Sequence, residues 1–190
     1  MKKVEILDKR FIFDDKYKIE EVKLRYEQYN GEMSKDLRRL SFERGDSVAA
    51  LLHNTSDDTF TLIEQFRYST WAKGPGWLQE VVAGTLEKGE DPKAGMIREI
   101  EEEAGIAVPD IEHIGTFYTS PGGSTERVFL YYAPYTAAMI KNAGGGLEEE
   151  GEDIRVIHLK REEMRTLVLQ NKVEDCKTMI ALQWVLLHKS

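Results

Sequence analysis

Three glutamates, Glu99, Glu102 and Glu103, have the residue type and the spacing that a metal site requires. Residues three and four positions apart lie on one face of a helix, so these side chains would project together, whereas Glu101 would lie on another side. Carboxylates gathered in this way repel one another, and hard divalent cations, which prefer oxygen ligands, relieve that repulsion. Arg98 can hold Glu102, one turn further on. From spacing alone, a solvated acidic helix face is the alternative to a cation site.

A helix over residues 91–104 is predicted to carry these glutamates. Asp91 suits the N-cap, Pro92 suits the first helical position, and Gly105 suits the position just past the end. Gly95 is a weak helix former and costs about 1 kcal/mol relative to alanine. An apolar stripe that can anchor the helix to a sheet is formed by Ile97, Ile100 and Ala104.

The rest of the chain is predicted to be rich in strands. Residues 1–45 form a strand-rich extension in which Asn30-Gly31 makes a tight turn between strands at 17–29 and 34–43. Further strands are expected at 47–53, 60–67, 78–83, 111–118, 127–135 and 154–159, and further helices at 161–170 and 176–188. This order predicts an α+β fold: a mixed sheet between helices, with an N-terminal antiparallel β extension.

Composition narrows the function classes. The net charge of −8, from 34 acidic and 26 basic residues, argues against a nucleic-acid binder, which needs a basic surface. The single cysteine, Cys176, excludes an intramolecular disulfide and is expected to be a small buried residue. The first residues lack the apolar segment of a signal peptide, and no apolar run approaches the ~20 residues of a membrane-spanning helix. We therefore expect a soluble, cytoplasmic protein with no membrane partner.

The glutamates belong to a longer pattern with fixed spacing. Its defined positions are Gly84, Glu90, Arg98, Glu99, Ile100, Glu102, Glu103, Gly105 and Ile106. The pattern resembles the signature box of the Nudix hydrolases, with every specified position filled. The resemblance implies a loop–helix–loop that binds divalent cations, with Glu99, Glu102, Glu103 and the carbonyl of Ala83 as ligands.

The resemblance covers nearly the whole chain and is to the ADP-ribose pyrophosphatases and the related GDP-mannose pyrophosphatases. It is carried by residues 30–34, 38–39, 42–45, 63–67, 120–127, 152–156 and 181–188. It implies a domain-swapped homodimer in which residues 1–45 are the exchanged dimerisation segment and residues 46–190 are the Nudix hydrolase domain. A thin sheet with little to bury it also makes a partner physically reasonable.

The same resemblance assigns substrate-binding residues. Arg39 and Arg67 match arginines that contact the nucleotide sugar, a role suited to bidentate binding of phosphate, with surface ion pairs as the alternative. Tyr17 is a base-stacking candidate, with strand packing as the alternative. Gly122 would let backbone approach the substrate, unless its loop is a plain turn. Glu126 would hold a ribose hydroxyl or an arginine that lies behind the residues in contact with the substrate.

The catalytic residues implied by the resemblance are Glu150, Glu152 and Arg98. A glutamate in the acidic stretch 147–153 would act as the general base on the attacking water. Glu150 is the first choice, with Glu152 and a glutamate of the box as alternatives.

These assignments predict Mg²⁺-dependent hydrolysis of the pyrophosphate bond of a nucleoside diphosphate sugar, with Mn²⁺ as a substitute metal. ADP-ribose, giving AMP and ribose 5-phosphate, is the first substrate. GDP-mannose is the alternative, because residues 142–146 resemble that branch. A hypothesis of a different class is a non-catalytic nucleotide sensor built on the same fold.

Overall fold

The computed structural model describes residues 2–147 and 151–189. They form two compact units, each described by itself below. Unit 1 comprises Met1–Asp46 and Tyr118–Arg127, and unit 2 comprises Ser47–Phe117 and Val128–Ser190.

Unit 1 is a three-stranded antiparallel sheet in the order β1-β2-β3. The strands are β1 (Val4–Asp14), β2 (Lys18–Tyr26) and β3 (Leu37–Glu43). Gly31 has a φ of +84° at the predicted turn before β3, a conformation that glycine adopts without steric cost. Phe42 on β3 bonds through its backbone N–H to the carbonyl of Gly123 (2.8 Å), which attaches the 118–127 segment. Within the described part of this unit only Val22 and Ser34 are buried, so the sheet has almost no core of its own.

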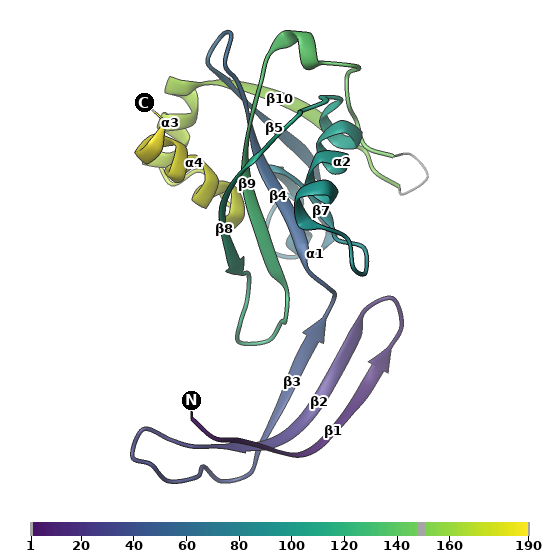
Figure 1. The fold of residues 1–190 in the computed structure, drawn as a ribbon, viewed down its shortest axis with the longest axis vertical. Helices are drawn as coiled ribbons and strands as arrows, with labels where there is room; N and C mark the ends of the chain where they lie inside the picture. Colours follow the sequence, from purple (N-terminus) through teal and green to yellow (C-terminus); the bar gives the residue numbers. More distant parts are fainter. Residues whose placement is uncertain (1, 148–150, 190) are drawn as a thin grey trace. The chain divides into compact units, whose positions relative to one another are not determined.

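Unit 2 is built on a second, mixed sheet, shown in Figure 1. Its path is β10-β5-β4-β9-β8, with β6 paired to β5 and β7 paired to β4. The strands are β4 (Ser47–Asn54), β5 (Thr59–Phe66), β6 (Trp77–Glu80), β7 (Val82–Thr85), β8 (Glu112–Tyr118), β9 (Arg127–Tyr135) and β10 (Arg155–Lys160). Strands β4 and β9 are parallel, whereas β4–β5, β4–β7, β5–β6 and β5–β10 are antiparallel.

Helices cover both faces of this sheet. They are α1 (Tyr68–Trp71), α2 (Pro92–Ala104), α3 (Arg161–Leu169) and α4 (Cys176–His188), with a 3₁₀ turn at Ala137–Met139. In Figure 1, α2 (teal) lies on one side of β4, and α3 and α4 (yellow-green and yellow) lie on the other. This arrangement, with the antiparallel sheet at the N-terminus, confirms the predicted α+β fold.

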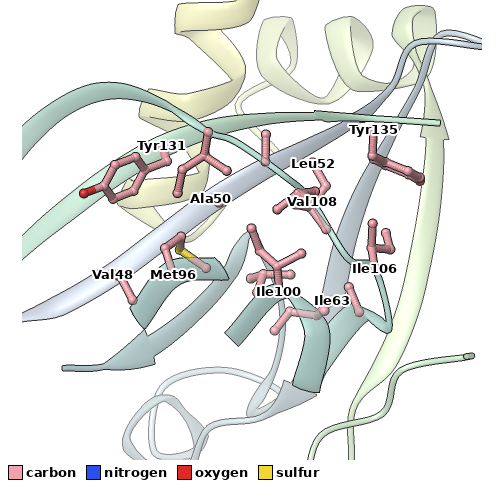
Figure 2. Packing of buried hydrophobic residues seen from close by; sticks show 14 of the residues in the cluster. Val48, Ala50, Leu52, Ile63, Met96, Ile100, Ile106, Val108, Tyr131 and Tyr135 are labelled. Atoms are coloured by element: carbon pink, nitrogen blue, oxygen red, sulfur yellow. The ribbon is translucent and has the colours of Figure 1, made fainter. Parts of the chain in front are cut away.

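Two apolar clusters fill the spaces between the layers. Figure 2 shows the first, in which Met96 and Ile100 of α2 pack among residues of β4 that include Val48, Ala50 and Leu52. The alternate residues of β4, Ala49 and Leu51, belong to the second cluster with Met164 of α3 and with Ala181, Leu182 and Val185 of α4. Every residue of β4 is therefore buried, as expected for a strand covered on both faces.

The predicted caps of α2 are confirmed. The side chain of Asp91 accepts a hydrogen bond from the N–H of Ala94 (3.0 Å), and Gly105 ends the helix with a φ of +67°. Gly95 is buried against the preceding loop, where an added Cβ would lie 2.8 Å from Leu86. A larger residue at this position would have to displace the ends of the Leu86 and Glu90 side chains, which accounts for a weak helix former inside the helix.

Two expectations about local structure were wrong. The single strand expected at 78–83 is two strands, because β6 pairs with β5 and β7 pairs with β4. Cys176 is exposed rather than buried, since it begins α4 and the buried face of that helix starts at Thr178. Among the described residues, no helix is both long and apolar enough to cross a membrane.

Candidate functional site

Glu103 is the most deeply buried carboxylate of the predicted site. It lies on α2 with 2% of its surface exposed, and its Oε2 accepts a hydrogen bond from the N–H of Ala83 (3.1 Å) on β7. The pKa of Glu103 is raised to about 8, mainly by burial and also by the negative charges of Glu152 and Glu99, against the lowering effects of the Ala83 N–H and of Arg67. A carboxylate that is costly to ionise is typical of a functional site.

Glu99 lies one turn before Glu103, directly against the backbone of β7. An added Cβ at Gly84 would lie 1.9 Å from the carboxyl carbon of Glu99. Glycine is therefore required at position 84, because any side chain would displace the carboxylate. Burial raises the pKa of Glu99 to about 6, although Arg98 lowers it.

Arg98 joins the remaining glutamates of the box. Its guanidinium is 2.8 Å from Glu102, 2.9 Å from Glu99 and 3.3 Å from Glu90. Glu90 also accepts the N–H of Glu87 (3.0 Å). The structure thus brings Arg98 and Glu102 together as predicted, and Arg98 supplies the positive charge that separates three neighbouring carboxylates.

The loop between β9 and β10 closes over the C-terminal end of α2. The N–H of Gly145 donates to the carbonyl of Glu103 (2.9 Å). Gly144 has a φ of +68°, and an added Cβ there would lie 2.3 Å from the same carbonyl, so only glycine allows this approach. These contacts hold residues 144–145, just before the acidic stretch, against the end of α2.

Glu152 is a described residue of that stretch, and its charge raises the pKa of two glutamates of the box. Its Oε2 accepts the N–H of Leu147 (3.0 Å), and its charge acts on both Glu99 and Glu103. Glu150, the first choice for the general base, lies outside the described residues.

The carboxylates are neighbours but do not surround one point. Within residues 2–147 and 151–189, no group of three or more His, Cys, Asp or Glu side chains is already placed to hold a metal ion. The contacts above give the reason, since Glu102 and Glu99 are drawn to Arg98 while Glu103 is bonded to Ala83.

Arg67, at the end of β5, is held by a carboxylate that the sequence analysis missed. Its Nε and Nη2 donate to the two oxygens of Glu80 at 3.1 and 2.9 Å, and Glu80 is only 2% exposed. The signal available in the sequence was a charged residue inside the apolar run 77–83, because acidic residues are rarely buried unless paired.

The other predicted substrate residues belong to unit 1. Tyr17 packs edge-on against Phe42 at 5.7 Å between ring centroids, with Arg44 over its ring. Glu126 accepts a hydrogen bond from Thr119 Oγ1 (3.0 Å) and lies 3.6 Å from Arg44. Glu126 thus lies beside Arg44 within unit 1, and its role toward a substrate stays a prediction.

Arg39 and Gly122 are both exposed in the same unit. Arg39 donates from Nη1 to the carbonyl of Arg38 (3.0 Å). Around Gly122, no atom lies within 4 Å of where a Cβ would be. Within unit 1, both positions are thus open to solvent.

An open pocket of about 440 Å³ lies in unit 2. It is lined by Glu64, Trp77, Asp153 and Arg155. Asp153 follows Glu152 in the chain, so the pocket adjoins the acidic stretch and presents one aromatic ring beside charged groups.

The chain is similar to one protein family and to relatives named for two pyrophosphatase activities. The family model described as "NUDIX domain" matches residues 43–178. The chain is 34% identical over 185 residues to a GDP-mannose pyrophosphatase of Enterobacter sp. (strain 638), which covers 96% of this chain and 95% of the relative. It is 34% identical over 186 residues to the ADP-ribose pyrophosphatase of Escherichia coli (strain K12), covering 97% and 88% respectively. It is 32% identical over 189 residues to the ADP-ribose pyrophosphatase of Haemophilus influenzae, covering 97% and 87%.

Proposed function

The chain belongs to the Nudix hydrolase family, and on that premise we propose that it hydrolyses the pyrophosphate bond of a nucleoside diphosphate sugar. ADP-ribose is the first proposed substrate, with AMP and ribose 5-phosphate as products. One observation carries the proposal: α2 holds the carboxylates of Glu99 and Glu103 against the backbone of Gly84 and Ala83 on β7, where the charge of Glu152 raises the pKa of both. Carboxylates in this position would suit a divalent cation, which prefers oxygen ligands.

The donor chemistry fits Mg²⁺, with Mn²⁺ as a substitute. Carboxylate oxygens of Glu99, Glu102 and Glu103 and the carbonyl of Ala83 would hold the metal, and all are hard oxygen ligands of the kind Mg²⁺ prefers. When bound, the metal neutralises phosphate charge and lowers the pKa of water. It also explains how a chain with a net charge of −8 binds an anion.

The chain's own residues divide the remaining work. A glutamate of the acidic loop, Glu150 or Glu152, takes a proton from the attacking water as the water oxygen bonds to phosphorus. The bridging P–O bond then breaks, and its electrons leave with the second phosphate. Arg98 acts indirectly by keeping Glu102 and Glu99 in place. Arg67 binds the diphosphate by charge-assisted hydrogen bonds.

The proposal includes a domain-swapped homodimer. Residues 1–45 would be the exchanged segment and residues 46–190 the hydrolase domain. Tyr17 and Arg39 would then contribute to the partner's substrate site, and Gly122 and Glu126 would contribute from the hydrolase domain. The exposed apolar side chains of β1, among them Phe11 and Phe13, support this arrangement because a second copy would remove them from water. A cytoplasmic location is also proposed, which a single cysteine fits.

GDP-mannose is the second candidate substrate. The relatives named for the two activities are equally similar to this chain, at 34% identity over nearly its whole length. Overall identity therefore does not rank the two substrates.

A substrate panel tests the proposal. The full chain is incubated with ADP-ribose, GDP-mannose or ADP-glucose and Mg²⁺, and released phosphomonoester is measured, with chelator as the control. We expect the fastest release from ADP-ribose and loss of release in chelator. Full activity in thorough chelator contradicts the metal site. Binding of ADP-ribose by calorimetry without turnover of any substrate indicates a sensor instead.

A further inference from the structure

The N-terminal turn of α4 contacts the segment that carries the predicted metal-binding carbonyl. The N–H of Val81 donates to Thr178 Oγ1 (2.8 Å), while the N–H of Ala83 donates to Glu103 on α2 (3.1 Å). Residues 80–83 are therefore held from α4 at one end and from α2 at the other. Thr178 is fully buried, so this hydrogen bond is shielded from water.

Asp175 fixes the position of Thr178. As the N-cap of α4, Asp175 accepts from both the N–H (2.9 Å) and the Oγ1 (2.6 Å) of Thr178 through its Oδ2. Its other oxygen accepts a hydrogen bond from Lys177 Nζ (2.9 Å). The helix cap and the contact with Val81 thus form one connected network.

Lys177 links this network to the arginine of the site. Its Nζ donates to Glu80 Oε2 (3.0 Å), the oxygen that also accepts from Arg67 Nη2 (2.9 Å). Arg67 in turn acts electrostatically on Glu103. Charges of alternating sign therefore run from Asp175 through Lys177, Glu80 and Arg67 to the buried glutamate of the box.

Because Lys177 and Arg67 share Glu80, the carboxylate neutralises only part of the charge of Arg67, and the rest can attract an anion. A single buried carboxylate paired with one arginine would neutralise it, and the arginine would have little attraction left for phosphate. A second cation on Glu80 compensates part of the carboxylate charge. Glu80 accepts hydrogen bonds from Nε and Nη2 of Arg67, and these two bonds fix the plane of the guanidinium. Nη1 does not bond to Glu80.

We propose that Lys177 is a positioning residue for pyrophosphate hydrolysis: by sharing the charge of Glu80 it lets Glu80 orient Arg67 toward the diphosphate without neutralising it. This inference rests on the proposed function. It assigns to α4 a part in substrate binding beyond its packing against the sheet.

The test uses the full chain with Lys177→Met, which keeps an unbranched side chain one atom shorter and removes the charge. We expect KM for ADP-ribose at saturating Mg²⁺ to rise about tenfold, with a smaller change in kcat, because ground-state and transition-state binding are weakened together. Lys177→Arg restores a cation and should return KM to within about twofold of wild type. Lys172→Met, at an exposed lysine before α4, is the matched control and should leave KM unchanged.

A double-mutant cycle separates positioning from a general effect on folding. In an Arg67→Met background, Lys177→Met should change KM by less than about twofold, because residues that act through one another are non-additive. An unchanged KM in Lys177→Met, or the same fold-change in both backgrounds, would overturn the inference. If wild type lacks turnover, the proposed hydrolysis fails and the dissociation constant of ADP-ribose, measured by calorimetry, is compared across the same variants. If wild type neither hydrolyses nor binds ADP-ribose, both proposals fall.

Discussion

Strands β1 and β4 show two ways of placing apolar and charged residues. In β4, every residue is buried between two helical layers. In β1, no residue is buried, although the strand carries large apolar side chains such as Phe11, Ile12 and Phe13. Unit 2 therefore hides its apolar surface within one chain, whereas unit 1 leaves it exposed.

Glu103, a deeply buried charged side chain of unit 2, differs from the surface charges of unit 1. In unit 1 they are paired at the surface, as where Arg10 bonds to Glu21 at 2.7 Å. In unit 2, Glu103 is nearly inaccessible, and the charges of Glu152 and Glu99 raise its pKa while that of Arg67 lowers it. Exposed ion pairs contribute little to stability, while clustered buried carboxylates are costly. Unit 1 thus exposes apolar surface, and unit 2 buries a carboxylate whose ionisation is costly.

Removing the carboxylate of Glu103 should have the largest effect of any single change. Glu103→Gln keeps the shape and can still accept the N–H of Ala83, but it removes a metal ligand of the proposed site. We expect kcat for ADP-ribose to fall at least ~1000-fold, because the proposed metal would act on the reacting phosphate directly. Phosphomonoester release at saturating Mg²⁺ measures this loss.

Glu101→Gln is the matched control for that change. Glu101 lies on the same helix but is exposed and faces away from the box. Its kcat should stay within about twofold of wild type, since isolated surface charges contribute little. Near-normal turnover in Glu103→Gln would remove the distinction between buried and surface carboxylates on which the site rests.

The exposed apolar surface of unit 1 gives the second prediction. Phe13 is 52% exposed, so in an isolated chain Phe13→Lys should be harmless. If a second copy covers β1, a buried lysine should weaken dimerisation at least ~100-fold, because an unpaired buried charge is strongly unfavourable. Sedimentation equilibrium measures the dissociation constant, with Asp8→Lys on the same strand as the control. A monomeric wild type would leave the swapped dimer without support.

Much of unit 2 could be predicted from the sequence because local signals and tertiary packing agree there. The caps of α2 at Asp91 and Gly105 were correctly identified, since a carboxylate acceptor and a left-handed residue are local requirements. The sharing of one face by Glu99, Glu102 and Glu103 follows from helical periodicity alone. Arg98 and Glu102, one turn apart, were expected to pair and do so at 2.8 Å.

What could not be predicted depends on contacts between distant segments. Residues 77–85 form two strands because the first part pairs with β5 and the second with β4. No local sequence pattern predicts this change of partner. Glu80 and Lys177 form a hydrogen bond although they are 97 positions apart in the chain, so no sequence pattern around either residue predicts the contact. The paired neighbours of Arg67 were missed for the same reason.

The smallest predicted effect is the pH dependence of stability in metal-free protein. Burial raises the pKa of Glu103 from 4.5 to about 8, so the folded state binds a proton there that the unfolded state has released. This contribution is fully present below pH 4.5 and is lost as pH rises through about 8. Between pH ~6 and ~7, wild-type protein in chelator should lose about 1 kcal/mol of unfolding free energy relative to Glu103→Gln, whose side chain at this position cannot ionise.

Urea unfolding at both pH values measures the difference. A parallel pH dependence of the two proteins would mean that Glu103 is ionised in the folded state, and the buried charge of unit 2 would then be no costlier than the surface pairs of unit 1.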